Sequence, residues 1–379
     1  MEISFGDKKL EKLANDYRKC INQYIPQVAF HPGETLSEKL EELGMGPKEF
    51  AVRTGKPEKT IIAIISGKSS ITAEMAVQFE HVLKIPAHFW LNIQRNYDEF
   101  VAREERRTVL TASIGWAKQF PLAEMIKKGW LPQNKSIESR TADLLAFFSI
   151  SNHGAWEDYY LKQQLKVAFR ISLAHTKEPY AISAWLRKGD LQAAELSAKD
   201  YNEKNFKDAL PDIKSVMAKH PVDFSKKLQS ICLAAGVKVV YTPCLPKAPI
   251  VGSTRWLNDT PLIQLSGRYK RNDSFWFTFF HEAGHIVLHG KKDIFLEKID
   301  YSDFDKNKEE EADSFAIRWT LTKEEEQEII DSGPLTEAHI RSFARKFNTH
   351  PAIIIGRLQH DELIPYGLGR QFFNPIEFN

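Results

Sequence analysis

Two histidines four residues apart, His281 and His285, with Glu282 beside the first, are the residues of this sequence best suited to chemistry. Four residues turn an α-helix by about 40° and advance it by about 6 Å, so both imidazoles can reach one metal ion. This spacing is the HExxH pattern, in which two histidines bind zinc and the glutamate is the general base for a water held by the metal. We therefore predict a Zn²⁺ site with His281 and His285 as ligands and Glu282 as the base.

The segment that carries these residues predicts a helix buried on every side. Asp273 is a suitable residue to cap its start, Gly290 is suitable to end it, and no proline lies between them. Its apolar residues point in all directions at 100° per residue. Buried ionisable side chains need partners, and a metal ion would be one. The alternative is a pair of core histidines that bond to backbone carbonyls. The apolar residues are Phe275, Trp276, Phe277, Phe279, Phe280, Ile286, Val287 and Leu288.

A third histidine, His289, follows at the end of the same helix. On a straight helix it lies about 12 Å beyond His281, too far for both to bind one metal at bonds near 2.1 Å. We interpret it as a helix-end histidine. The longer metzincin pattern is excluded, because its glycine and third histidine would fall at Leu288 and Lys291.

The third protein ligand that zinc usually requires is predicted in the acidic run 308–319. Glu309 lies one turn before the buried face of this helix, whereas Glu310 and Glu311 project further round. Asp313, four residues after Glu309, can bond to the second nitrogen of a ligand histidine and so hold its tautomer. The alternative is that the acidic run is only a solvated first turn. The buried face is formed by Ala312, Phe315, Ala316 and Trp319.

Residues 265–290 and 309–316 together resemble the ImmA/IrrE family of metallopeptidases, and the resemblance extends over roughly residues 226–379. It implies a gluzincin-like zinc site in which His281, His285 and Glu309 are ligands and Glu282 is the general base. The leucine-rich, proline-ended continuation usual in the family is absent after residue 316, which leaves the substrate-side wall of the cleft undefined. His360 or Tyr366 could stabilise an oxyanion if either folded back to the metal.

The segment from residue 47 to residue 70 predicts a helix-turn-helix. Two short helices, 48–53 and 57–66, are joined by a turn that contains Gly55. In this geometry the second helix enters the DNA major groove and nearby cations contact phosphates. The segment carries five basic residues against two acidic ones, which favours a polyanion. The predicted DNA contacts are Lys48, Lys56, Glu58, Lys59, Thr60 and Lys68.

Residues 31–34, 67–76, 89–94 and Tyr97 resemble, in order and spacing, the HigA-type antitoxin DNA-binding domain over residues 29–103. The resemblance implies operator DNA and a RelE/HigB-like toxin as partners, and a homodimer if the operator is palindromic. Ile62 and Ala63 depart from it, because polar residues are usual at these positions of the recognition helix. The alternatives to ordinary operator binding are an altered sequence specificity and an interaction module that no longer binds DNA. Residues 1–20 also resemble the opening of HigB-like toxins, over a stretch too short to carry activity.

Length and composition limit the remaining possibilities. The 379 residues allow two or three domains, and a net charge of +2 favours neither a basic coat nor an acidic tail. Three cysteines without ligand-like spacing suit a reducing cytoplasm. We find no signal peptide and no apolar run of membrane-spanning length, so we expect a cytoplasmic protein with no membrane partner.

We predict a mostly α protein with a C-terminal α+β domain. The expected parts are an N-terminal helical extension (1–28), a five-helix helix-turn-helix domain (29–103), a helical connector (104–225) and an ImmA/IrrE-like zinc metallopeptidase domain (226–379). In the last part, short β-type runs predict a small sheet packed on the His281 helix. In the connector, Gly189 is expected to end one helix, with another starting at Asp190.

The combined hypothesis is a DNA-binding regulator or antitoxin that carries a zinc-dependent endopeptidase. Its substrate would be a protein: a partner repressor, a toxin, or this chain itself. The alternative is a toxin-antitoxin repressor whose metal domain is a non-catalytic sensor or a toxin-binding scaffold.

Overall fold

The computed structural model describes residues 29–163, 178–246, 248, 250–290, 295–296, 303–333, 335–376 and 378. The predicted N-terminal extension, residues 1–28, lies outside the described residues. The chain divides into two compact units between Val109 and Leu110. The second unit contains the predicted metallopeptidase domain together with the predicted connector from residue 110 onward, and the four-part division stays a prediction.

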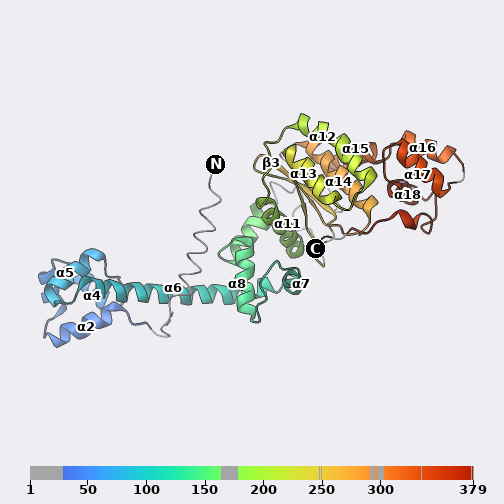
Figure 1. Cartoon of the computed structure of the whole chain (residues 1–379). Helices are drawn as coiled ribbons and strands as arrows, with labels where there is room; N and C mark the ends of the chain where they lie inside the picture. Colours follow the sequence, from blue (N-terminus) through green and yellow to red (C-terminus); the bar gives the residue numbers. More distant parts are fainter. Residues whose placement is uncertain are drawn as a thin grey trace. The chain divides into compact units, whose positions relative to one another are not determined.

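The first unit is built from short helices followed by the start of a long one (Figure 1). His31 caps the first of them, since its Nδ1 accepts a hydrogen bond from the Gly33 amide at 2.9 Å. Thr72 caps the fourth, since its side-chain oxygen accepts a hydrogen bond from the Met75 amide. The prediction of a five-helix helix-turn-helix fold is confirmed. The helices are α2 (Pro32–Glu42), α3 (Pro47–Thr54), α4 (Glu58–Ile65), α5 (Ala73–Leu83) and α6 (Ala87–Ala117).

The second unit begins with helices packed around aromatic side chains. Trp156 is fully buried and stacks on Tyr180, with 5.0 Å between the ring centroids. Trp116, Phe120 and Phe148 surround it in edge-to-face contacts, an arrangement that aromatic quadrupoles favour. The helices are α7 (Leu122–Lys127), α8 (Ile137–Phe148), α9 (His153–Trp156), the π-helical segment η1 (Glu157–Gln163) and α11 (Pro179–Ala194).

A small sheet follows, after α12 (Glu203–Lys219) and α13 (Phe224–Ala234). Its strand order is β1-β3-β2-β4, with β1 parallel to β3 and the other neighbours antiparallel. Asn258, at φ 57°, forms the tight turn between β2 and β3, a conformation that asparagine tolerates. The predicted small sheet is therefore confirmed. Its strands are β1 (Lys238–Tyr241), β2 (Gly252–Leu257), β3 (Thr260–Leu265) and β4 (Phe295–Leu296).

The two faces of this sheet are covered by different helices, because successive strand residues point to opposite faces. On one face Thr254 donates a hydrogen bond to the Glu282 carbonyl of α14 (Asn272–His289) at 3.0 Å. On the other, Arg255 binds the Asp190 carboxylate of α11 at 2.7 and 3.0 Å. A helix of the predicted connector is thus one layer of the sheet domain.

Helix α11 corrects one prediction, since it runs through Gly189 and Asp190 without a break. The reason is tertiary: a Cβ on Gly189 would lie 2.0 Å from Oε1 of Gln264 on β3. The glycine lets this helix approach the sheet closely and does not end it.

The remaining helices share one hydrophobic core with α14. The prediction that α14 is buried on every side is confirmed over most of the helix and is wrong at Leu288, which is 49% exposed. One detail of its start is wrong in the sequence prediction. The helix begins at Asn272 with Arg271 as N-cap, and Asp273 is instead held by the Arg271 guanidinium at 2.7 and 3.0 Å. No helix among the described residues is long and apolar enough to span a bilayer. The C-terminal elements are α15 (Asp303–Thr320), α16 (Lys323–Asp331), α17 (Glu337–Lys346), α18 (Pro351–His360) and the 3₁₀ turn η3 (Arg370–Phe372).

Candidate metal centre

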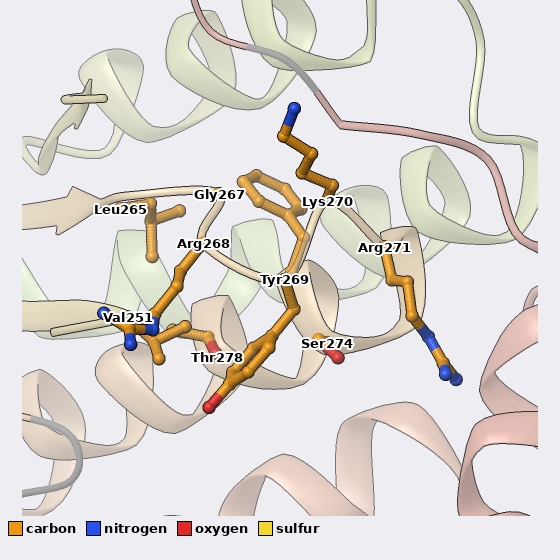
Figure 2. A pocket seen from close by; sticks show the side chains of 10 residues that line it. Val251, Leu265, Gly267, Arg268, Tyr269, Lys270, Arg271, Ser274 and Thr278 are labelled. Atoms are coloured by element: carbon orange, nitrogen blue, oxygen red, sulfur yellow. The ribbon is translucent and has the colours of Figure 1, made fainter. Parts of the chain in front are cut away.

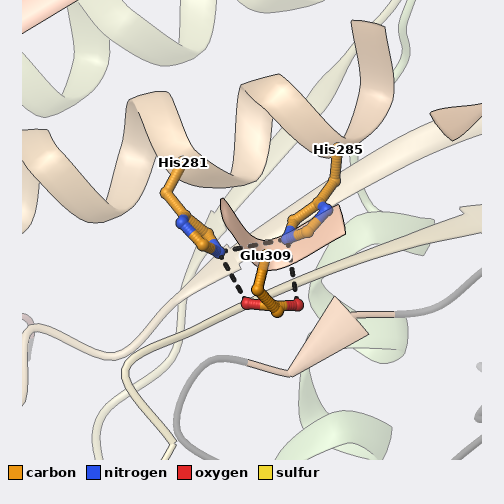
Figure 3. A group of neighbouring side chains, drawn as sticks. All are labelled: His281, His285 and Glu309. Carbon is orange, nitrogen blue, oxygen red and sulfur yellow. Dashed lines mark hydrogen bonds and ion pairs between the residues drawn. The ribbon is translucent and has the colours of Figure 1, made fainter. Parts of the chain in front are cut away.

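Three side chains from α14 and α15 converge on one point (Figure 3). Nε2 of His281 lies 3.0 Å from Nε2 of His285, and the Glu309 carboxylate oxygens lie 3.2 Å and 3.4 Å from these two nitrogens. Ligands bound to zinc at about 2.1 Å in a tetrahedral arrangement lie about 3.4 Å apart. Both the donor set and its spacing therefore fit a zinc ion held by three protein ligands.

The close approach of α15 to α14 places Glu309 at this point. Gly284 lies between the two histidines in sequence, and a Cβ there would be 3.1 Å from Cβ of Phe315 and 3.3 Å from Cα of Ala312. The buried face of α15, predicted from helical spacing, is thus the face that contacts Gly284. Packing through a glycine brings the first turns of α15 within reach of the imidazoles.

The outer nitrogens of both imidazoles have partners as well. Asp313 Oδ1 lies 2.8 Å from Nδ1 of His281. Nδ1 of His285 lies 3.0 Å from Nδ1 of His289, whose Nε2 lies 2.8 Å from the Glu311 carboxylate. When the Nδ1 atoms carry the protons in these contacts, both Nε2 lone pairs face Glu309, as metal ligation requires.

The protonation of His285 agrees with this arrangement. Burial, followed by the neighbouring charges of His281, His289 and Lys308, holds the pKa of His285 well below its usual value. A neutral imidazole is the form that binds a metal.

Glu282 follows the ligand His281 on α14, and its side chain faces the sheet. Its side chain is fully buried against β2, where a Cβ on Gly252 would lie only 2.6 Å from Glu282 Oε1. The Thr254 hydrogen bond to its carbonyl fixes the same turn of α14. A carboxylate held next to a metal site in this way can accept a proton from water.

A cleft of about 530 Å³ opens from the metal ligands, with His281, Glu309 and Asp313 in its wall. His360 lines this cleft, whereas Tyr366 is 67% exposed and is not among the lining residues. Apolar and basic side chains of α14, α15 and α18 form much of the remaining wall: Phe277, Ile317, Ile353 and Arg357.

Tyr269 belongs both to this cleft and to a neighbouring hollow below the loop that joins β3 to α14. Figure 2 shows its ring over the first turns of α14, beside Ser274 and Thr278. The loop therefore contributes an aromatic side chain to the cleft.

The predicted DNA contacts lie on α3 and α4 of the first unit and close to the ends of α4. Glu58 and Lys59 are exposed in the first turn of α4, and Thr60 is half-buried. Lys56 is engaged by Glu74, with 2.7 Å between its Nζ and the carboxylate. Lys48 and Lys68 are exposed as well.

Three contributors to the metal centre are missed by reasoning from the sequence. The sequence indicates only a helix-end position for His289, although it follows His285 by four residues, as His285 follows His281. Glu311 is expected to project away from the site, and its contact with His289 depends on how α15 packs against α14. Gly252 carries no local signal, because its role depends on the approach of β2 to Glu282.

Comparisons with known proteins find similarity in two parts of the chain. A stretch of 63 residues in the N-terminal part is 33% identical to the uncharacterized HTH-type transcriptional regulator YddM of Escherichia coli (strain K12), covering 17% of this chain and 67% of that protein. This part of the chain belongs to the HTH-type transcriptional regulators. Residues 232–357 match the IrrE N-terminal-like domain of the peptidase M78 family. An HTH-type regulator domain and a stretch that matches the IrrE N-terminal-like domain are thus joined in one chain.

Solved structures similar to the regulator domain are antitoxins. An addiction module antidote protein of the HigA family from Coxiella burnetii is 35% identical, over 20% of this chain and 84% of that one, with a TM-score of 0.20. The Pseudomonas aeruginosa antitoxin HigA, solved with the higBA promoter, is 29% identical, over 21% of this chain and 86% of that one, also with a TM-score of 0.20.

Proposed function

We propose that this chain is a DNA-binding regulator or antitoxin that carries a zinc-dependent endopeptidase. The observation that carries the peptidase proposal is the convergence of His281, His285 and Glu309, two of which, His281 and Glu309, line an open cleft. Glu282 follows His281 on the same helix and is fully buried. Two imidazole nitrogens and one carboxylate form the ligand set of zinc hydrolases that keep one coordination position open.

In the proposed hydrolysis of a peptide bond, each residue of the site would have its own role. His281, His285 and Glu309 would hold a zinc ion, which would supply a Lewis acid for the activation of water and of a peptide carbonyl. Glu282 takes the proton from the attacking water and returns it to the leaving amine nitrogen. Asp313 and His289 hold the two ligand imidazoles in the tautomer that directs Nε2 toward the metal.

The cleft walls favour a protein segment with an apolar side chain next to the cleaved bond. Phe277, Ile317 and Ile353 present apolar surface within the same cleft as the ligands. Arg357 adds a cation there, which suits a carboxylate of the substrate. The candidate substrates are a partner repressor, a toxin and another segment of this chain.

A non-catalytic sensor or toxin-binding scaffold is the competing function. Structural zinc sites are usually closed by four protein ligands. Among the described residues the group comprises three donors, and the cleft reaches it. This openness favours catalysis over a purely structural metal.

For the regulator domain, we propose operator DNA as ligand, a homodimer on a palindromic operator and a RelE/HigB-like toxin as partner. The 33% identity to YddM, an HTH-type transcriptional regulator, supports operator binding by this domain. The exposed cations on and beside α4 are suited to contact DNA phosphates. A protein that binds operator DNA has to be in the same compartment as that DNA, and the compartment we propose is the cytoplasm.

The peptidase proposal is tested by metal analysis and by cleavage of candidate substrates. The purified full chain should hold about one zinc per protein and should cleave a candidate repressor, toxin or itself. Glu282→Gln should retain zinc and lose cleavage by at least about 100-fold. The matched control is Glu310→Gln, the same chemical change at an exposed neighbour of the site. Zinc without Glu282-dependent cleavage would establish the sensor or scaffold instead.

The DNA proposal is tested by salt-dependent binding to the region upstream of the gene. Lys59→Ala and Lys68→Ala should each weaken binding and reduce the slope of log K against log[salt] by about 1. Lys39→Ala is the control, because Lys39 is already paired with Glu42. Unchanged slopes in both test variants would remove α4 and the turn after it from the DNA interface.

A further inference from the structure

Helix α4 buries one side and exposes the other, and the burial fixes its rotation. Ile61 and Ile64 are fully buried in the core of the first unit. At 100° per residue they define one face, and the opposite face is centred near residues 59 and 66. Which side chains α4 offers to a ligand is therefore determined by these two isoleucines.

The stripe opposite the buried isoleucines is Lys59, Ile62, Ala63 and the C-cap residue Ser66, at the i, i+3, i+4 and i+7 spacing of one helical face. Ala63 is half-buried and the other three are exposed. Ile62 is 49% exposed and lies in the middle of this stripe. Glu58 and Thr60 fall on its flanks, because they are 100° to either side of Lys59. The centre of the face is thus aliphatic, while its beginning is cationic.

The surroundings of this aliphatic centre are positively charged. Lys48, Lys59 and Lys68 form no ion pair with any residue that the structure describes, whereas Arg53 is paired with Glu49 and Lys56 with Glu74. The N-terminal end of α4 adds the positive end of a helix dipole. An apolar spot beside cations that are not held in ion pairs fits a polyanion that carries apolar groups.

We propose that Ile62 reads thymine, by contact with its C5-methyl group in the DNA major groove. The thymine methyl is the apolar group that base pairs display in that groove, and aliphatic side chains are its usual partners. Lys59 and Lys68 would contact the flanking phosphates. This inference rests on the proposed DNA binding and names the base that the helix recognises.

The experiment removes only the C5-methyl group of a thymine from the DNA. The full-length protein selects its preferred duplexes from a random DNA pool, and the best duplex is resynthesised with deoxyuridine at one thymine at a time. Deoxyuridine keeps the pairing and lacks only the C5-methyl. Burial of one methyl group corresponds to about a fourfold change in an equilibrium constant. We expect one or two positions per half-site to lose about fourfold in affinity.

Variants of the protein assign the effect to Ile62. With Ile62→Ala, the affinities for thymine and deoxyuridine at those positions should become equal within about a factor of two. The control is Val77→Ala on α5, since Val77 is also 49% exposed and lies outside α3 and α4. It should keep the full preference for thymine.

The possible failures are distinct from one another. Tight binding that no deoxyuridine substitution changes would overturn thymine reading and leave DNA binding intact. A deoxyuridine effect that persists in Ile62→Ala would also overturn it. Absence of any selected duplex would refute the DNA-binding proposal itself. Dissociation of a dimer by Ile62→Ala, with DNA affinity unchanged, would show that this face binds protein.

Discussion

Replacement of His289 by leucine should weaken metal binding by about 10- to 100-fold, although His289 is not among the proposed ligands. The His289 side chain is only 4% exposed, and its two nitrogens connect His285, at 3.0 Å, to the Glu311 carboxylate, at 2.8 Å. With its Nε2 proton bonded to Glu311, His289 presents a lone pair on Nδ1. That lone pair accepts the Nδ1 proton of His285 and keeps Nε2 of His285 available to a metal.

The magnitude follows from what the leucine removes. In the metal-free variant the proton of His285 can move to Nε2, which faces Glu309 at 3.4 Å. Metal binding then has to return this proton to Nδ1, where its acceptor is gone. Loss of the acceptor of a buried N–H group costs about 1–3 kcal/mol, or roughly 5- to 150-fold in affinity.

Zinc affinity measured by competition with a chromophoric chelator tests this reasoning without any substrate. The Co²⁺-loaded protein adds a spectroscopic readout of the ligand set. Glu311→Gln is the control, because its amide oxygen can still accept from His289 and the residue is exposed; its affinity should stay within about threefold of wild type. A leucine variant that folds like wild type and binds zinc equally well would refute the tautomer argument.

Three further changes test other parts of the fold. Gly252→Ala places a Cβ 2.6 Å from Glu282 Oε1, so we expect cleavage to fall by about 100-fold with zinc content unchanged. Gly189→Ala inserts a methyl into the buried amide of a β3 glutamine and should lower the free energy of unfolding by about 1–3 kcal/mol in urea titrations; no loss would contradict the close packing of α11. Burial lowers the pKa of His220 and of His350 to about 4, so the unfolded chain, with histidine pKa near about 6.5, binds more protons. Urea titrations should therefore show stability rising with pH from about 4 to about 6.5, more weakly in His220→Asn.

Much of the helical architecture follows from local sequence. The caps and stops around α3, α4 and α5 depend on nearest neighbours, so the helix-turn-helix can be predicted from Gly55 and Thr72 and from apolar spacing. The same is true of α14, where apolar residues on every side require burial. The juxtaposition of His281 and His285 is a property of one helical turn, and it needs no tertiary information.

Helical spacing also indicates Glu309 and Asp313, because it defines the buried face of α15. The structure brings both to the histidines. Helical spacing does not predict which residues contact Nδ1 of His285. The contact between His289 and Glu311 depends on the distance between α14 and α15, which Gly284 sets through its missing Cβ.

By itself, the sequence determined most of the elements, the direction of their buried faces and the pair of histidines on one turn, since each depends on residues within about four positions. Only the tertiary structure decided that α11 forms a layer of the sheet domain and that Gly189 and Gly252 mark close approaches and not helix ends or flexible points. A glycine has the same local preferences in either role. What distinguishes them is a side chain far away in sequence, Gln264 in one case and Glu282 in the other, that occupies the place of the missing Cβ.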